Sequence, residues 1–188
     1  MAQTLDQIKK DAEARMAKSV EALKTELGKI RTGRAHAGLL DHVRVDYYGT
    51  KTPLNQLANI STADARTLTV TPYDKGALSA IDKAIRESDL GLNPAAAGQI
   101  LRVPLPPLTE ERRRELGKHV HKEGENAKIA IRNVRRDSNQ HLKEQLKKKL
   151  ISEDDDKRAE EAVQKMTDRF IGDVDKLVAA KEQEIMQV

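Results

Sequence analysis

The chain has 188 residues and a formal net charge of +4, with 34% charged, 38% apolar and only 2% aromatic residues. Such a composition is typical of long amphipathic helices and argues against a compact enzyme core. The lack of cysteine excludes disulfides and thiolate metal sites, and no apolar stretch approaches the roughly 20 residues of a membrane span, so we expect a cytoplasmic protein outside the membrane.

The N-terminal part of the chain predicts one long helix. Apolar side chains recur at steps of three and four from Leu5 to Ile30, which is the spacing of one helix face. No proline interrupts this stretch, and Gly33 follows it where a helix commonly ends. We therefore expect a helix over residues 4–30.

The middle of the chain predicts short strands. Residues 43–47 and 67–71 alternate apolar and polar side chains, as half-buried strands do, and residues 100–103 are a further candidate strand. Residues 77–87 have the spacing of a short helix. These elements predict a small α+β unit that is large enough to fold alone.

Two neighbouring tyrosines stand out in this aromatic-poor chain. Tyr47 and Tyr48 lie at the end of the first predicted strand. Stacking on nucleic-acid bases is one use for such side chains. We expect them instead to pack within the core or hinge of the small unit.

The C-terminal half predicts two more long helices joined by a tight turn. Thr109 is expected to cap the second helix, which then continues for about 40 residues, or about 60 Å. Its predicted buried stripe ends with Ser138, His141 and Leu146. Ser152 is expected to cap the third helix, because acidic residues follow it at the positive end of the helix dipole.

The order of these elements predicts two domains. Three long amphipathic helices bury their apolar stripes most simply in a three-helix bundle. We expect residues 1–30 and 106–188 to form this bundle, and residues 31–105 to form a small α+β domain inserted into it. Because two chain segments connect the domains, we expect an elongated or bent α+β protein with a hinge.

Charge is unevenly distributed between the second and third helices. Residues 112–149 hold 13 Lys and Arg against 5 Asp and Glu, whereas residues 151–188 hold 6 against 11. On a helical wheel, the second helix has an apolar stripe between a basic flank and a flank of acidic and amide side chains. The basic flank contains Arg114, Lys118, His121, Lys128, Arg132, Arg135, Arg136, Asn139 and Lys143. Because guanidinium groups suit phosphate oxygens, this flank is a candidate nucleic-acid-binding face.

The basic flank is also compatible with two roles that involve no nucleic acid. Its arginines are able to pair with acidic residues of the third helix, for which Asp168, Asp173 and Asp175 are candidates. The flank also suits a coiled-coil adaptor or chaperone-like protein that docks an acidic protein partner. His119 and His121 diverge on a helix, so they predict no metal site, and no nucleophile with its base is recognisable. We therefore expect no enzyme activity.

Seven segments together resemble the ribosome recycling factors of bacteria. The longest reads Arg-Val-Pro-Leu-Pro-Pro-Leu-Thr-Glu-Glu-Arg-Arg. The resemblance extends over essentially the whole chain and its segments occur in order. They are residues 29–35, 47–50, 53–54, 88–94, 102–113, 131–137 and 151–155.

The resemblance implies both a fold and a function. The fold is an L-shaped, tRNA-sized monomer with a three-helix bundle (domain I) and a hinged β/α/β domain (domain II). The family binds ribosomal RNA of the large subunit in the region of the A and P sites after termination. With elongation factor G and GTP, it releases the ribosome from messenger RNA by splitting the complex into subunits. The resemblance implies no cofactor, metal or catalytic residue.

The resemblance also implies roles for particular residues, to which the basic flank adds Lys128. The expected RNA-binding residues are Arg31, Arg113, Lys128, Arg132, Arg135 and Arg136. The expected hinge residues are Arg31, Thr32, Gly33, Arg34, Arg102, Val103, Pro104, Leu105, Pro106 and Pro107. The small domain is expected to contact elongation factor G, through residues that the sequence does not identify.

Overall fold

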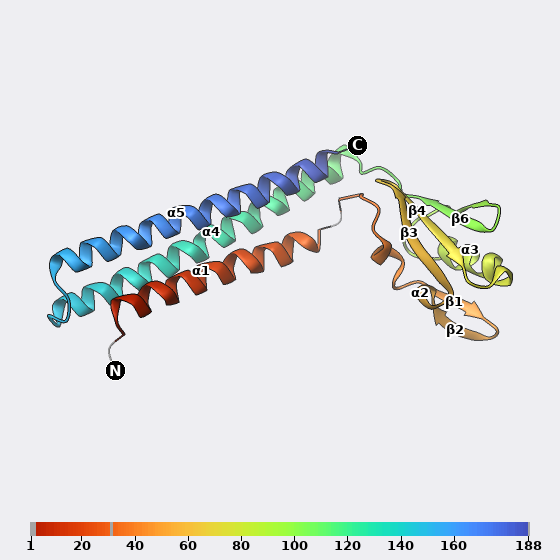
Figure 1. The fold of residues 1–188 in the computed structure, drawn as a ribbon. Helices are drawn as coiled ribbons and strands as arrows, with labels where there is room; N and C mark the ends of the chain where they lie inside the picture. The colour runs from red at the N-terminus through yellow and green to blue at the C-terminus, as the bar shows by residue number, and fades with distance from the viewer. Residues whose placement is uncertain (1–2, 31, 188) are drawn as a thin grey trace. The chain divides into compact units, whose positions relative to one another are not determined.

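A computed structural model describes residues 3–30 and 32–187, which divide into two compact units (Figure 1). The helical unit contains residues 3–30 and 110–187, and the small unit contains residues 32–109. Long helices in one unit and antiparallel sheets in the other confirm the predicted α+β class. The helical unit resumes at Glu110, four residues after the predicted boundary at 106.

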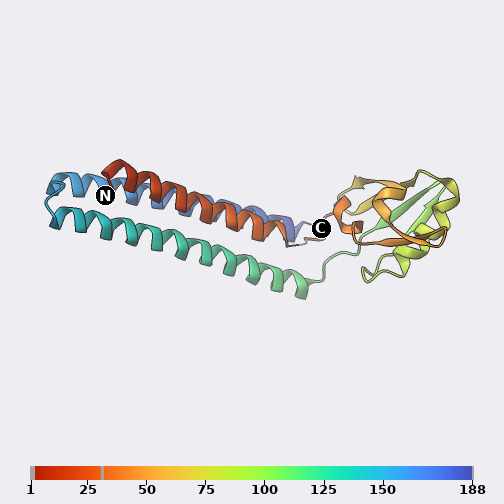
Figure 2. The same ribbon diagram turned by 90° about the horizontal axis from the view of Figure 1, so that it is seen from below.

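Three long helices lie side by side in the helical unit: α1 (Leu5–Gly28), α4 (Glu110–Lys147) and α5 (Glu153–Met186) (Figures 1 and 2). Helix α1 ends two residues before the predicted end at 30. Ser152 caps α5 as expected, because its side chain accepts a 3.1 Å hydrogen bond from the Asp155 amide while the Asp155 carboxylate accepts one from the Ser152 amide.

The core of the helical unit is one apolar stripe from each helix. Met16, Ile131 and Val163 represent the three stripes, and each is completely buried. The predicted stripe of α4 is wrong near its C-terminal end, where His141 is exposed and Leu142 is buried instead. The reason is the helical period, since Leu142 is four residues after the buried Ser138, and a step of three from Ser138 falls short of a full turn.

The turn between α4 and α5 is closed by backbone hydrogen bonds. The Leu150 amide donates to the Gln145 carbonyl and the Lys149 amide to the Leu146 carbonyl, both at 3.0 Å. These bonds form a Schellman-type helix end, which puts Lys149 in the left-handed region with φ +57°. The predicted tight turn is therefore present.

The small unit contains two antiparallel sheets. Strands β1 (Arg44–Tyr47) and β2 (Thr50–Pro53) form a hairpin. The other sheet has the order β3-β4-β6-β5, from strands β3 (Ala58–Asp64), β4 (Thr67–Pro72), β5 (Ala95–Ala97) and β6 (Ile100–Pro104). The predicted strands correspond to β1, β4 and β6, whereas β2, β3 and β5 were not predicted, because they are polar or consist only of alanine and so lack an alternating pattern.

Helical segments complete the small unit around its core. The predicted helix at 77–87 is α3 (Leu78–Arg86), and shorter segments are η1 (Ala37–Leu40), α2 (Leu54–Leu57) and η2 (Lys75–Ala77). Helix α3 buries Ile81 and Ile85 in the same core as Val45, Leu68 and Leu101 of the strands. This core is separate from that of the helical unit, so each unit has its own apolar interior.

Both chain segments that lead into the small unit are fastened to one turn of its sheet. The Ala35 amide donates to the Ala65 carbonyl at 2.8 Å, and the Leu105 amide donates to the Arg66 carbonyl at 2.7 Å. Ala65 and Arg66 connect β3 to β4. The expected hinge residues Arg102, Val103 and Pro104 belong to strand β6 and pair with β4. Of the expected hinge, only residues 32–34 and 106–107 lie beyond these two hydrogen bonds among the described residues.

Candidate nucleic-acid-binding face

The two flanks predicted for α4 face different neighbouring helices. On the basic flank, the Lys128 Nζ atom lies 2.6 Å from Asp175 Oδ1 of α5, and His121 contacts Glu182 of the same helix. On the opposite flank, Asp137 forms a 2.9 Å ion pair with Arg15 of α1. The predicted flanks are thus correct, because α5 lies along the basic flank and α1 along the acidic and amide flank.

Lys128 is held by acidic neighbours on two helices. Besides Asp175, its ammonium group lies 3.7 Å from Glu125 Oε1 one turn earlier. The hydrogen bond that Lys128 donates to Asp175 raises the pKa of Lys128, and the two carboxylate charges add to this effect. Since its side chain is only 20% exposed, Lys128 is a weaker candidate for contact with an outside phosphate than the sequence indicated.

Arg132 and Arg136 differ from Lys128 because their guanidinium groups have no such partner. Within residues 3–30 and 32–187, no ion pair or hydrogen bond involves either side chain. Arg136 is exposed and Arg132 is half-buried. Arg135 is intermediate, since its Nη1 donates a 3.2 Å hydrogen bond to the neutral amide oxygen of Gln164 on α5. All three guanidinium groups keep donors that suit an anionic partner.

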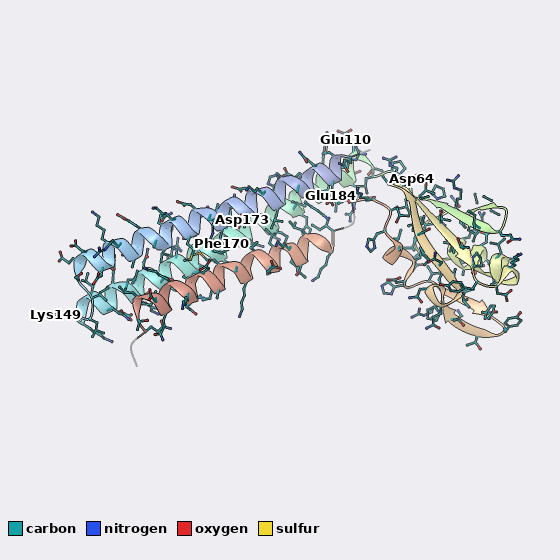
Figure 3. The ribbon with its side chains drawn as sticks, in the orientation of Figure 1. Asp64, Glu110, Lys149, Phe170, Asp173 and Glu184 are labelled. Carbon is teal, nitrogen blue, oxygen red and sulfur yellow. The ribbon has the colours of Figure 1, made fainter. Side chains whose placement is uncertain are left out.

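The third helix therefore does not neutralise the arginine cluster. Asp175 pairs with Lys128, and Asp168 accepts a hydrogen bond from Gln164. Asp173 lies on α5 near the middle of the helical unit (Figure 3). For the described part of the chain, no ion pair joins these carboxylates to the arginines at 132, 135 or 136. The expectation of pairing within the bundle is correct for Lys128 and wrong for the three arginines.

Further side chains extend the cationic surface towards the end of α4. A shallow groove along this helix begins at Arg136 and continues past two lysines, Lys143 and Lys147. Its full lining is Arg136, Asn139, Gln140, Lys143, Glu144 and Lys147. Sequence reasoning included Lys143 and missed Lys147, although Lys147 lies four residues after Lys143 on the same face. We call the surface of Arg132, Arg135, Arg136, Lys143 and Lys147 the cationic face.

Arg113 is not brought to this face. Arg113 lies in the first turn of α4, 19 residues before Arg132, which corresponds to about 28 Å along the helix. Its Nε atom is buried without a hydrogen-bond partner among the described residues. Arg31 lies outside the described residues. The candidate face therefore rests on the second half of α4.

Ile129 is a side chain of this region that sequence reasoning missed. It is 50% exposed and lies three residues before Arg132 and seven before Arg136, so it shares their side of α4. An apolar residue outside the buried stripe was the signal available in the sequence. The cationic face thus has an apolar border.

The described residues contain neither a membrane-spanning helix nor a metal-ligand cluster. None of the helices formed by residues 3–30 and 32–187 combines the length and the apolar character needed to cross a bilayer. Over the same residues, no three side chains of His, Asp or Glu converge in a way that would hold a metal ion.

The chain matches a known protein family over most of its length. Residues 23–186 match the family described as ribosome recycling factor. The chain is 64% identical over 182 residues to the ribosome-recycling factor of Nitrosospira multiformis, with 97% of this chain and 98% of that protein covered. A solution structure of a ribosome recycling factor is 46% identical, covers 100% of both chains and gives a TM-score of 0.66.

A second solved structure is similar over a comparable length. It contains models for the T. thermophilus ribosome recycling factor and the E. coli elongation factor G bound to the E. coli post-termination complex. Its matching chain is 48% identical, with 98% of this chain and 100% of that chain covered, and the TM-score is 0.60.

Proposed function

This chain belongs to the ribosome recycling factor family, and from that membership we propose that it releases ribosomes from messenger RNA after termination. In this proposal it acts with elongation factor G and GTP to split the post-termination complex into subunits for reuse. The observation that carries the proposal is sequence identity over nearly the full length of a ribosome-recycling factor. A similar protein placed with elongation factor G on the post-termination complex supports the choice of partner.

The same proposal covers the chemical role of the protein. It acts as a cytoplasmic monomer, and it takes no part in bond making or breaking. In this proposal GTP hydrolysis belongs to the partner, and the arginine and lysine side chains of the cationic face hold phosphate. The protein contributes binding energy and mechanical stiffness.

The cationic face is proposed to anchor the protein on ribosomal RNA. Arg132 and Arg136 have no partner among the described residues, so a phosphate contact would not have to break an existing ion pair. Arg135 would only have to exchange a neutral amide, Gln164. Each phosphate that these residues neutralise releases counterions, so binding should weaken steeply as salt increases.

In this proposal, helix α4 is the stiff element that transmits force while the cationic face holds ribosomal RNA. Its 38 residues form one unbroken helix, and α1 and α5 pack along it. Force applied at one end of such a supported helix is transmitted with little bending. We propose that the small unit moves about residues 32–34 and 106–107 when elongation factor G acts on it, and that α4 transmits this motion to the subunit contacts.

The decisive experiment measures subunit splitting of purified post-termination ribosomes. Light scattering should decrease when the protein is added with elongation factor G and GTP, and should stay unchanged when either factor or the nucleotide is left out. An unchanged signal with all components present would contradict the proposal. The adaptor alternative predicts this unchanged signal, because a protein that only docks an acidic partner would not split ribosomes.

A further inference from the structure

The most exposed aromatic side chain of the described structure is at the tip of the β1–β2 hairpin. The chain has only three tyrosines, one phenylalanine and no tryptophan. Phe170 is buried in the helical unit, whereas Tyr48 and Tyr73 of the small unit are 85% and 70% exposed. The expectation that Tyr48 packs within the core or hinge is therefore wrong, while its neighbour Tyr47 is half-buried against the core.

Tyr48 also occupies a backbone position that tyrosine does not favour. Tyr47 pairs with Thr50, so the hairpin loop consists of Tyr48 and Gly49. Their φ values of +48° and +80° are those of a type I′ turn. Asparagine, aspartate or glycine is preferred at the first of these positions, because a larger side chain is strained there. Burial does not compensate for this strain, since Tyr48 is exposed.

Neighbouring groups hold the Tyr48 ring in place. Its centroid lies 4.5 Å from that of Tyr47, with the planes at 73°, in an edge-to-face contact. The Tyr47 hydroxyl donates a 2.8 Å hydrogen bond to Asp74 Oδ2. Asp74 Oδ1 in turn accepts a 2.9 Å bond from the Gly76 amide, which fixes the carboxylate. Tyr48 is thus an exposed aromatic ring on a rigid support, which limits the entropy lost on binding.

The charges around this hairpin favour a protein partner over nucleic acid. In register, Asp46 lies directly opposite Lys51, so one pair of opposite charges lies near the tyrosine. Residues 32–109 contain eight Lys and Arg against seven Asp and Glu, and the small unit lacks the cationic excess of α4. Phosphate binding requires such an excess, whereas tyrosine anchors with nearly neutral surroundings are typical of protein–protein interfaces.

We propose that Tyr48 is the anchor by which the small unit docks on its protein partner, elongation factor G. This inference rests on the proposed function and adds the contact residue. The tyrosine ring would enter an apolar pocket of the partner, and the mixed charges at Asp46 and Lys51 would form the polar rim. A strained backbone position at an exposed tip supports a functional role, and contact with a partner would supply one.

The test replaces Tyr48 by asparagine, the residue that the turn prefers. Tyr48→Asn removes the ring and relieves the turn, so the variant should fold with an equal or higher Tm. It should bind ribosomes alone within about twofold of the parent, yet split them with elongation factor G and GTP about tenfold more slowly or worse, because interface anchors have effects of this size. Tyr48→Phe keeps the ring and should restore most of the rate.

A second tyrosine supplies the matched control. Tyr73→Ser removes a comparably exposed ring from a residue that has ordinary negative φ, and it should leave the splitting rate within about twofold of the parent. Normal splitting by Tyr48→Asn would overturn the proposal, as would an equal loss in both variants. Loss of ribosome binding without the partner would also overturn it, because the ring would then contact the ribosome. Failure of the parent protein to split ribosomes would instead contradict the proposed function.

Discussion

The helical unit and the small unit carry opposite kinds of surface. The second half of α4 exposes arginines and lysines, and the aromatic side chain of the helical unit, Phe170, is only 8% exposed. The small unit has nearly balanced charge and exposes two tyrosines. Contacts made by the first surface should depend on salt, and contacts made by the second should depend on shape and apolar burial. One chain thus presents two surfaces suited to two chemically different partners.

The separation of the cores makes this comparison testable by mutation. The tyrosines all lie in the small unit, and the three long helices all lie in the helical unit. Tyrosine fluorescence therefore reports unfolding of the small unit, and far-UV circular dichroism at 222 nm mainly reports the helices. A substitution in one core should change one signal and leave the other unchanged.

The largest expected effect is at Gly124, where α4 packs closely against α5. A Cβ atom added to Gly124 would lie 2.6 Å from Val178 Cγ2, and a valine in a helix has little freedom to rotate away. Gly124→Ala should therefore destabilise the helical unit by about 1–3 kcal/mol, measured by urea unfolding at 222 nm. Tyrosine fluorescence should be unaffected.

Gly117 is the matched control for this substitution. It lies in the same helix, and beyond its own chain neighbours and the adjoining helix backbone no atom is within 4 Å of an added Cβ. Gly117→Ala should stabilise the helical unit by about 0.5–1 kcal/mol, because alanine favours the helix. Equal effects of the two substitutions would show that α4 and α5 are not in close contact at Gly124.

The second largest expected effect is on ribosome affinity, which should depend on whether the replaced arginine already has an ion-pair partner. Arg132 has no partner within the described residues, whereas Arg15 is paired with Asp137 on the other flank. Arg132→Ala should lower ribosome affinity about tenfold and reduce the slope of log affinity against log salt by about 1. Arg15→Ala removes the same charge and should change the affinity less than about twofold. Co-sedimentation over a salt series measures both, and identical slopes for the two variants would contradict the anchoring face.

The smallest effect concerns the acid stability of the small unit. The Gly76 amide and then the Tyr47 hydroxyl donate hydrogen bonds that lower the pKa of Asp74 below its ordinary value of 3.8. A carboxyl whose pKa is lower in the folded state stabilises that state above pH 3.8, and this stabilisation is lost as the pH falls through the folded value. Asp74→Asn should therefore have a lower Tm at neutral pH and a shallower loss of Tm in acid.

Tyrosine fluorescence during thermal unfolding between about pH 2 and pH 6 measures this dependence. Asp64 remains in the variant, and the Arg66 amide lowers its pKa as well, so some acid sensitivity should persist. A pH profile identical to that of the parent protein would show that the pKa of Asp74 is not lowered in the folded protein in solution.

Local sequence patterns predicted the long helices correctly and missed half of the strands. Met16 and Val163 each belong to a series of apolar residues at steps of three and four, and this pattern is visible without any knowledge of the fold. Strand β5 consists of three alanines, all exposed, and it exists because β6 offers its hydrogen-bonding edge. Such a strand is specified by its neighbour, so it has no signal of its own.

The candidate binding residues show the same difference between what local sequence and what tertiary structure determine. The sequence by itself determined that the cations of α4 share one flank, because helical spacing depends only on the order of residues. Only the tertiary structure decided that Lys128 pairs with Asp175, since α5 supplies this carboxylate from a distant part of the chain. Arg132 has no such partner among the described residues. The tertiary structure also decided that Tyr48 is at an exposed, strained tip, because its exposure depends on how β1 and β2 pair. Spacing is a local property, whereas pairing and exposure depend on the segments that fold against a residue.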